Sequence, residues 1–489
     1  MSQIESKKPG VRRRTLGVLL IPTLIVGGLV SIPVAANAAE PVGTAILTEV
    51  DVPGTLIQSA AAVDLAAAGY TETEYYASGT ANRYDGTAGT TTATVLDGGH
   101  AYTTRVIVRT PSPDKFNGSL VVEWNNVTIG VDGEFVFGEV NEYLLREGYA
   151  VAAVSAQRNG VETLKTWEPT RYGTLSVDAN VCGSGGTSLC TGDPLSFDIF
   201  TQVAKAVADN SGGALAGLDV ESVVATGQSQ SGIRLATYYN TIQPIYDYFD
   251  GFVYHDRAAP LRADVDTPAI TVDSDALHAL GSWPYWQTST WTRVWELAGG
   301  THGSEFVRQY MDVAFARDQA KLGPDGQPIT FTQWLEPSCA VVDTATGGQF
   351  GPVDTGYVLA AAFKAIQTWN ATGEPAPPSI YFDRDAAGTP IRDAQHISQG
   401  GIHLPALVAP TMFFDAWNGP PYLFPCAVGG YHIDYTPAEL KAMYGNHGKY
   451  VSLVSKTAQK LVEQGYLLAE DAQAEIRTAA QSDVAKKGK

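Results

Sequence analysis

A serine stands at the junction between an apolar run and a turn near the middle of the chain. Ser229 lies within Gly227-Gln-Ser-Gln-Ser-Gly232, directly after the apolar run Val220–Thr226. Small residues around a serine at a strand-to-helix turn leave room for a strained backbone and expose the hydroxyl. The amide of Gln230, at the start of the following helix, would then face a developing oxyanion. The segment predicts a nucleophilic serine, with Ser231 standing where a second glycine is usual.

A serine nucleophile needs a base, and the base needs an acid that orients it. Two later apolar strands, 269–272 and 293–297, are followed by Asp275 and His302 respectively. Loops that follow parallel strands meet at the carboxyl edge of a sheet, so both side chains are expected near the serine. We therefore predict His302 as the general base and Asp275 as the acid that holds it.

Other residues compete for both roles. His447 is the rival base, because a histidine late in the chain can fold back onto the site. Asp273 is the first rival of Asp275, and Asp256, which follows the apolar strand 252–254, is a further candidate. A loop aspartate is also commonly a turn or helix-capping residue, so each of these positions has a purely structural alternative.

A tetrahedral oxyanion usually receives two backbone N–H donors. The first is expected from Gln230. The second would come from the loop after the strand 119–124, where the amide of Asn126 or Val127 could face the site. The alternative for the Asn125-Asn126 pair is that its side chains only cap the turn.

The elements around these residues predict an α/β protein. Residues from about 45 to 110 are rich in Thr, Val and Tyr with Gly and Asp turns, which indicates short strands. From about 111 to 329, near-continuous apolar strands alternate with helices, which is typical of a mostly parallel sheet covered on both faces. Residues from about 330 to 489 contain an Ala-rich helix (357–368) and a helical end from Pro437. We expect this C-terminal extension to pack against the sheet and to form part of the substrate cleft.

The first 38 residues resemble an export signal. Five basic residues precede an apolar run, which ends in Ala36-Asn37-Ala38, a small-x-small cleavage site. We expect cleavage near Ala38-Ala39, a secreted mature domain over 39–489, and no stable membrane anchor afterwards. The alternative is an uncleaved N-terminal anchor, since the apolar run approaches the length that spans a bilayer. Arg13-Arg14 leaves open whether export follows the general or the twin-arginine route.

Charge and cysteine content narrow the possible functions. The formal net charge is -19 over 489 residues, and removal of residues 1–38 leaves 27 basic and 50 acidic residues, a charge of -23. Such acidity argues against a nucleic-acid-binding protein. Four cysteines in an exported protein favour two disulfides, and we predict Cys182–Cys190 and Cys339–Cys426 among the three possible pairings. No spacing of cysteine and histidine indicates a metal site.

The sequence resembles a family of bacterial secreted proteins described as alpha/beta hydrolase domain proteins. The segments that carry the resemblance span nearly the whole mature chain and are 64–81, Val122-Glu-Trp-Asn-Asn126, 171–175, 197–200, Gly227-Gln-Ser-Gln-Ser231, Val294-Trp-Glu-Leu-Ala-Gly299 with His302, and 465–471. The resemblance implies an α/β-hydrolase fold with a C-terminal extension, together with serine hydrolase chemistry. It implies little about the substrate, because this fold hosts many reactions.

Together these patterns predict a secreted serine hydrolase that cleaves small-molecule or polymeric carboxylic esters through an acyl-enzyme, without a metal or organic cofactor. An acyltransferase or a peptidase could use the same three residues, and a non-catalytic extracellular binding protein could use the same scaffold. Four aromatic residues between the predicted acid and base indicate an aromatic-lined cleft, with ordinary core packing as the alternative; they are Trp283, Tyr285, Trp286 and Trp291.

Overall fold

The structure is a computed structural model. It describes residues 42–85, 91–182, 192–257, 259–279, 289–339, 347–417 and 426–486. The predicted export signal at residues 1–38 therefore lies outside the described residues, as do Cys190 and the side chain of Cys426. No helix in the described ranges is long and apolar enough to cross a membrane.

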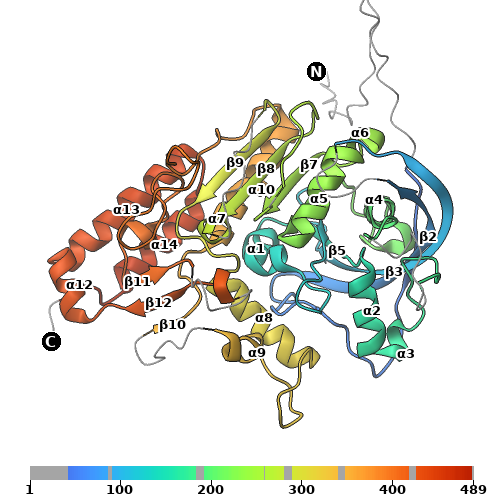
Figure 1. Ribbon diagram of the computed structural model, residues 1–489, viewed down its shortest axis with the longest axis horizontal. Helices are drawn as coiled ribbons and strands as arrows, with labels where there is room; N and C mark the ends of the chain where they lie inside the picture. Colours follow the sequence, from blue (N-terminus) through green and yellow to red (C-terminus); the bar gives the residue numbers. More distant parts are fainter. Residues whose placement is uncertain are drawn as a thin grey trace, which may run out of the picture.

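A nine-stranded sheet forms the centre of the protein, in the order β1-β2-β3-β5-β4-β6-β7-β8-β9 (Figure 1). The first three strands and the β3–β5 pair are antiparallel, and every later pair is parallel. The strands are β1 (Ile46–Glu49), β2 (Tyr70–Tyr84), β3 (Val95–Pro111), β4 (Ser119–Trp124), β5 (Ala150–Val154), β6 (Ser222–Gln228), β7 (Gly251–His255), β8 (Ala269–Ser274) and β9 (Thr292–Leu297).

Helices cover both faces of the sheet. The central strands β4, β5, β7 and β8 are buried along their whole length, as their unbroken apolar sequences require. Helices α4 and α5 pack against strands on one face of the sheet, and α1 and α10 pack on the other. A separate apolar core lies on each face. The helices up to residue 318 are α1 (Phe135–Arg146), α2 (Arg158–Trp167), α3 (Pro169–Tyr172), α4 (Ser196–Ala208), η1 (Ser211–Gly213), α5 (Gln230–Thr241), α6 (Gln243–Tyr246), α7 (Asp275–Ala279) and α8 (Glu305–Asp318).

The C-terminal extension packs against the sheet, as expected from the sequence. Helix α10 contacts β7 and β8, and two parallel bridges, Trp295–Ile380 and Leu297–Ile402, continue the sheet beyond its edge strand β9. A small sheet of order β10-β12-β11 lies beside it. The extension comprises α9 (Phe331–Leu335), η2 (Glu336–Ser338), β10 (Gly347–Gln349), α10 (Thr355–Thr372), α11 (Pro405–Val408), β11 (Met412–Asp415), η3 (Cys426–Val428), β12 (Tyr431–Asp434), α12 (Pro437–Tyr444), α13 (His447–Gln464) and α14 (Ala469–Gln481).

Candidate active site

Ser229 occupies the sharp turn between β6 and α5. Its backbone has φ 56° and ψ −120°, a left-handed conformation that is strained for a residue with a side chain. The turn is fixed from both sides: the Ser229 N–H donates to the carbonyl of His255 (3.0 Å), and its carbonyl accepts the N–H of Ile233 (2.9 Å). The predicted strand–turn–helix around Ser229 is therefore present, with the helix beginning directly after the serine.

The small residues around Ser229 are required by the tight packing of this turn. A Cβ on Gly227 would lie 3.1 Å from the backbone carbon of Ser231, closer than ordinary van der Waals contact. Ser231 replaces the usual glycine and uses its hydroxyl within the turn, accepting the N–H of Gln228 (3.0 Å) and donating to its carbonyl (2.8 Å). Ser231 is therefore engaged in holding the turn, while Ser229 borders a pocket.

His302 lies beside Ser229 at the carboxyl edge of the sheet. Both residues line the same pocket, and the Gln228 side-chain amide donates to the His302 carbonyl (2.8 Å). The N–H of His302 donates to the carbonyl of Val428 (2.9 Å). The C-terminal extension therefore helps to position the loop that carries His302.

The acid that contacts His302 is Asp256, so the prediction of Asp275 is wrong. The Nδ1 atom of His302 lies 2.5 Å from Oδ2 of Asp256, which follows β7 and has a φ of 51°. Ser274 also donates to this carboxylate, with its N–H (2.5 Å) and its hydroxyl (2.7 Å). Burial opposes ionisation of Asp256, but His255 and His302 outweigh it and lower its pKa below the ordinary value. Asp256 is therefore an ionised partner for the imidazole.

Asp275 is turned toward the C-terminal extension. Its carboxylate accepts the hydroxyl of Ser398 (2.7 Å) and the N–H of Gly299 (3.0 Å), and it pairs with Arg392 (2.6 Å). These bonds occupy both oxygens with groups of the histidine loop and the extension, so Asp275 ties the two together.

Neither remaining rival lies beside His302 in a catalytic arrangement. Asp273 is fully buried and interacts electrostatically with Arg257. His447 is the first residue of α13. Its two ring nitrogens lie 2.8 Å and 3.1 Å from the carbonyl oxygens of Val484 and Ala480, respectively. His447 is thus held within the C-terminal helices, whereas His302 lines the pocket that contains Ser229.

The loop after β4 offers one of the two predicted oxyanion amides. The backbone N–H of Asn126 donates to the Gly133 carbonyl (2.8 Å), so it is not available for an oxyanion. Within the described residues, the amide of Val127 has no acceptor. The Asn126 side chain reaches across to the carbonyl of Gln228 (2.9 Å) and thereby joins this loop to the serine turn. Gln230 begins α5, where a first-turn N–H has no partner within the helix.

Buried charges fix the loop that carries these amides. Asp132 accepts a bond from Arg105 (2.9 Å) and one from the side chain of Asn125 (2.9 Å). Glu123, at the end of β4, accepts the N–H groups of Val136 and Phe137 at the start of α1 (2.8 Å each). Removing one partner of a buried ion pair such as Asp132–Arg105 costs several kcal/mol, so the loop is held rigidly. Polar residues inside the sheet, which composition alone does not reveal, thus position the site.

The pocket that contains Ser229 and His302 is small and mainly apolar. Its cavity volume is about 40 Å³. Its apolar side chains are Ile129, Phe135, Val307, Phe331, Phe350 and Val428. The last three belong to the extension, which therefore supplies part of the wall, as expected. Of the four aromatic residues predicted for the cleft, Trp291 instead stacks on Trp369 (ring centroids 6.1 Å apart), and the other three lie outside the described residues.

Glu139 supports the histidine loop from the side opposite the pocket. This buried α1 residue accepts both the N–H (2.8 Å) and the hydroxyl (2.6 Å) of Ser304, two residues after His302. Burial raises the pKa of Glu139 to about 7, with Asp256 contributing in the same direction. Sequence patterns gave no sign of this residue, because a glutamate within a helix is normally solvated.

The raised pKa of Glu139 makes stability depend on pH. Between its ordinary value of 4.5 and about 7, the unfolded chain releases this proton while the native protein retains it, so the free energy of unfolding falls as pH rises. Over this range the free energy of unfolding should fall by roughly 3 kcal/mol in the original protein. We expect this fall to be absent in Glu139→Gln, whose side chain can still bond Ser304. Urea unfolding between about pH 4.5 and pH 7 measures this pH dependence of the free energy of unfolding. Glu162→Gln on the surface of α2 is the control. An unchanged pH slope in Glu139→Gln would contradict the assignment.

Comparison with known proteins agrees with this architecture. The chain belongs to the family described as "Alpha/beta hydrolase domain", which matches residues 31–477. No curated protein matches the sequence.

Comparison with solved structures gives matches that are distant in sequence and in shape. Esterase Est22 is 12% identical, covers 52% of this chain and 79% of its own, and has a TM-score of 0.29. A structure of fungal esterases from Rhizomucor miehei is 10% identical, covers 49% of this chain and 82% of its own, and has a TM-score of 0.26. Poly(aspartic acid) hydrolase-1 from Sphingomonas sp. KT-1 is 13% identical, covers 37% of this chain and 71% of its own, and has a TM-score of 0.24. At such values the likenesses say nothing of the substrate.

Proposed function

We propose that this protein is a serine hydrolase that cleaves carboxylic esters through Ser229, His302 and Asp256. The proposal rests on one observation: a serine on a strained turn and a histidine in contact with an aspartate occur at the same small pocket. These three residue types in this relation are the means by which a hydroxyl becomes a nucleophile at neutral pH.

The reaction follows from the geometry of His302. Because Asp256 faces Nδ1, Nε2 remains to take the proton from the Ser229 hydroxyl as its oxygen attacks the ester carbonyl. The amides of Gln230 and Val127 are assigned to the resulting oxyanion. His302 then protonates the departing alcohol, which leaves an acyl-enzyme. Water, deprotonated by the same imidazole, attacks this acyl group and releases the acid and free Ser229.

The apolar lining of the pocket favours an uncharged group next to the ester carbonyl. An ionised substrate group would lose its hydration against Phe135, Phe331 and Phe350 without a compensating charge among the residues that line the pocket. We therefore assign esters with a compact apolar acyl or aryl group to this site.

Labelling by a fluorophosphonate tests the proposal directly. The folded protein is expected to bind one equivalent covalently at Ser229, identified by peptide mass spectrometry, and to lose esterase activity in proportion. Protein denatured before addition of the probe is the control and should not react. Absence of labelling in folded protein would refute the proposal and favour a non-catalytic binding protein; labelling without ester turnover would favour an acyltransferase or a peptidase.

We further propose that the mature protein is secreted after cleavage before Ala39 and carries the Cys182–Cys190 and Cys339–Cys426 disulfides. The basic, apolar and small-x-small regions of residues 1–38 support export, and oxidation follows from the compartment. Intact mass of the secreted protein should fit a chain that begins at Ala39, about 4 Da lighter before reduction than after it. A start upstream of Ala39, or four free thiols, would contradict this.

A further inference from the structure

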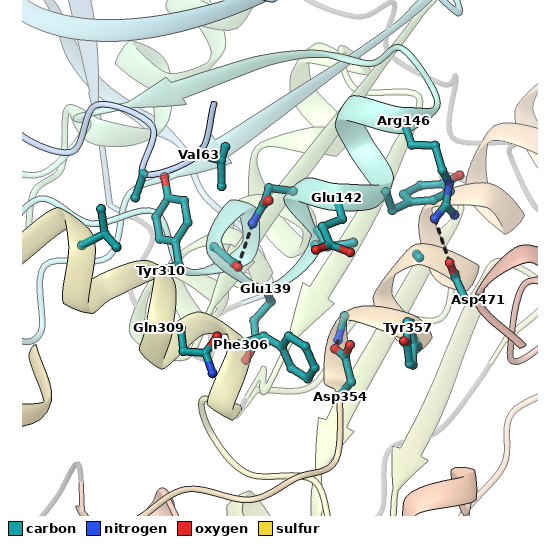
Figure 2. Close-up of a pocket in the computed structure, with 18 residues that line it drawn as sticks. Val63, Glu139, Glu142, Arg146, Phe306, Gln309, Tyr310, Asp354, Tyr357 and Asp471 are labelled. Atoms are coloured by element: carbon teal, nitrogen blue, oxygen red, sulfur yellow. Dashed lines mark hydrogen bonds and ion pairs between the residues drawn. The ribbon is translucent and has the colours of Figure 1, made fainter. Parts of the chain in front are cut away.

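A second pocket, separate from the one at Ser229, lies between α1, α8, α10 and α14 (Figure 2). Its cavity volume is about 270 Å³, and it opens to solvent. Helix α1 divides the two pockets: Phe135 faces the first, whereas Glu139, Glu142 and Arg146 line the second. None of the residues lining the second pocket takes part in the reaction proposed above.

Carboxylates dominate the polar lining of this second pocket. Glu139, Glu142, Asp354 and Asp471 all line it, and Arg146 is the one basic residue among the lining residues of the described chain. Arg146 is itself engaged by acids, pairing with Asp471 (2.8 Å) and with Glu470 (3.3 Å). The pocket therefore presents four carboxyl groups to a single guanidinium that is already paired.

An unsatisfied acceptor marks the pocket independently of its charge. Asp471 is only 4% exposed, and one of its oxygens, Oδ1, is bonded to Arg146. Its other oxygen, Oδ2, is buried and has no hydrogen-bond partner within the described residues. A buried carboxylate oxygen without a donor costs free energy, which a ligand with an N–H group would recover.

The other carboxylates are also short of cations. Asp354 caps α10 by accepting the N–H of Gly356 (2.8 Å), and its neighbour Glu139 is bonded to Ser304. Burial raises the pKa of Asp354 well above its ordinary value, and Glu139 adds to that shift. A positive charge between them would stabilise both in the ionised form.

The remaining walls are aromatic and apolar. Tyr143, Phe306, Tyr310 and Tyr357 line the pocket. Figure 2 shows the last three beside the carboxylates. Aromatic faces attract cations and also cover an apolar body. A bare metal ion does not fit this lining, since no group of three metal-ligating side chains is found among the described residues.

We propose that this pocket binds an organic ammonium ion that carries N–H donors and an apolar body. The charged end is assigned to the carboxylates and the unsatisfied Asp471 oxygen, and the apolar body to the aromatic walls. The site is distinct from the hydrolytic pocket and does not depend on the function proposed for it.

Calorimetric titration of the folded protein with 2-phenylethylammonium tests this proposal. We expect one site per chain, at least tenfold weaker binding of the neutral 2-phenylethanol, and weaker binding of the trimethylated quaternary ion, which lacks N–H donors. A dissociation constant above about 10 mM for the ammonium, or equal binding of the alcohol, would overturn the proposal.

Two substitutions place the binding at this pocket. Glu142→Gln changes an exposed side chain, and Asp354→Asn keeps a side-chain oxygen for the N–H of Gly356, so both variants are expected to fold. Their combination should raise the dissociation constant of 2-phenylethylammonium at least tenfold. Glu162→Gln on α2 removes the same charge elsewhere and should leave it unchanged. Equal weakening by Glu162→Gln, or none in the double variant, would refute the assignment.

Discussion

Replacement of Ser229 by alanine is expected to lower kcat/KM for an activated ester such as p-nitrophenyl acetate by on the order of 10⁵-fold. The alanine retains the turn, because the bonds that fix it come from the backbone of Ser229 to His255 and Ile233. What is lost is the hydroxyl that the proposed mechanism assigns to His302 for activation. The residual rate would reflect substrate binding and the oxyanion amides acting on water.

Ser231→Ala is the matched control for this substitution, since it removes a hydroxyl two residues away on the same turn. Among the described residues the Ser231 hydroxyl bonds only to the backbone of Gln228, so its loss should lower stability by about 1 kcal/mol and leave the activity within roughly tenfold. Rates are measured with each variant shown to be folded by circular dichroism. A Ser229→Ala enzyme with a tenth or more of the original activity would exclude Ser229 as the nucleophile.

The sheet and the serine turn could be predicted because local signals specify them. Unbroken apolar runs predicted β4 to β9, and Gly227 with Gly232 predicted the turn after β6. The central elements of the fold, and the placement of Ser229 and His302 at one pocket, were thus available from the sequence. Helix α8 was not predicted, since its apolar residues form only a narrow buried face.

The acid could not be identified in the same way, because three aspartates stand at equivalent strand ends. Asp256, Asp273 and Asp275 all follow or end an apolar strand, and the backbone direction at each decides where its carboxylate points. A left-handed φ turns Asp256 toward His302, whereas Arg392 and Ser398 draw Asp275 to the extension. Those partners lie more than a hundred residues away in sequence, so no local pattern reports them.

Asp256→Asn is expected to reduce kcat/KM by about 10³- to 10⁴-fold, whereas Asp275→Asn should cost less than tenfold in folded protein. An asparagine at 256 presents an N–H₂ donor or a weak acceptor to Nδ1 of His302 in place of a carboxylate. Donation by the amide favours the tautomer with its proton on Nε2, which cannot accept the proton of Ser229. Loss of the negative charge also removes stabilisation of the imidazolium that forms during attack.

Asp275→Asn is the matched control, because it makes the same chemical change in a buried carboxylate that directly follows the neighbouring strand β8. It weakens the pair with Arg392 and the bonds to Ser398 and Gly299, so its main effect should be a loss of stability of several kcal/mol. Thermal unfolding separates the two cases: Asp275→Asn should lower Tm more than it lowers kcat, and Asp256→Asn the reverse. If folded Asp275→Asn lost as much activity as Asp256→Asn, the acid would have to be reassigned, because the proposed mechanism gives Asp275 no direct contact with His302.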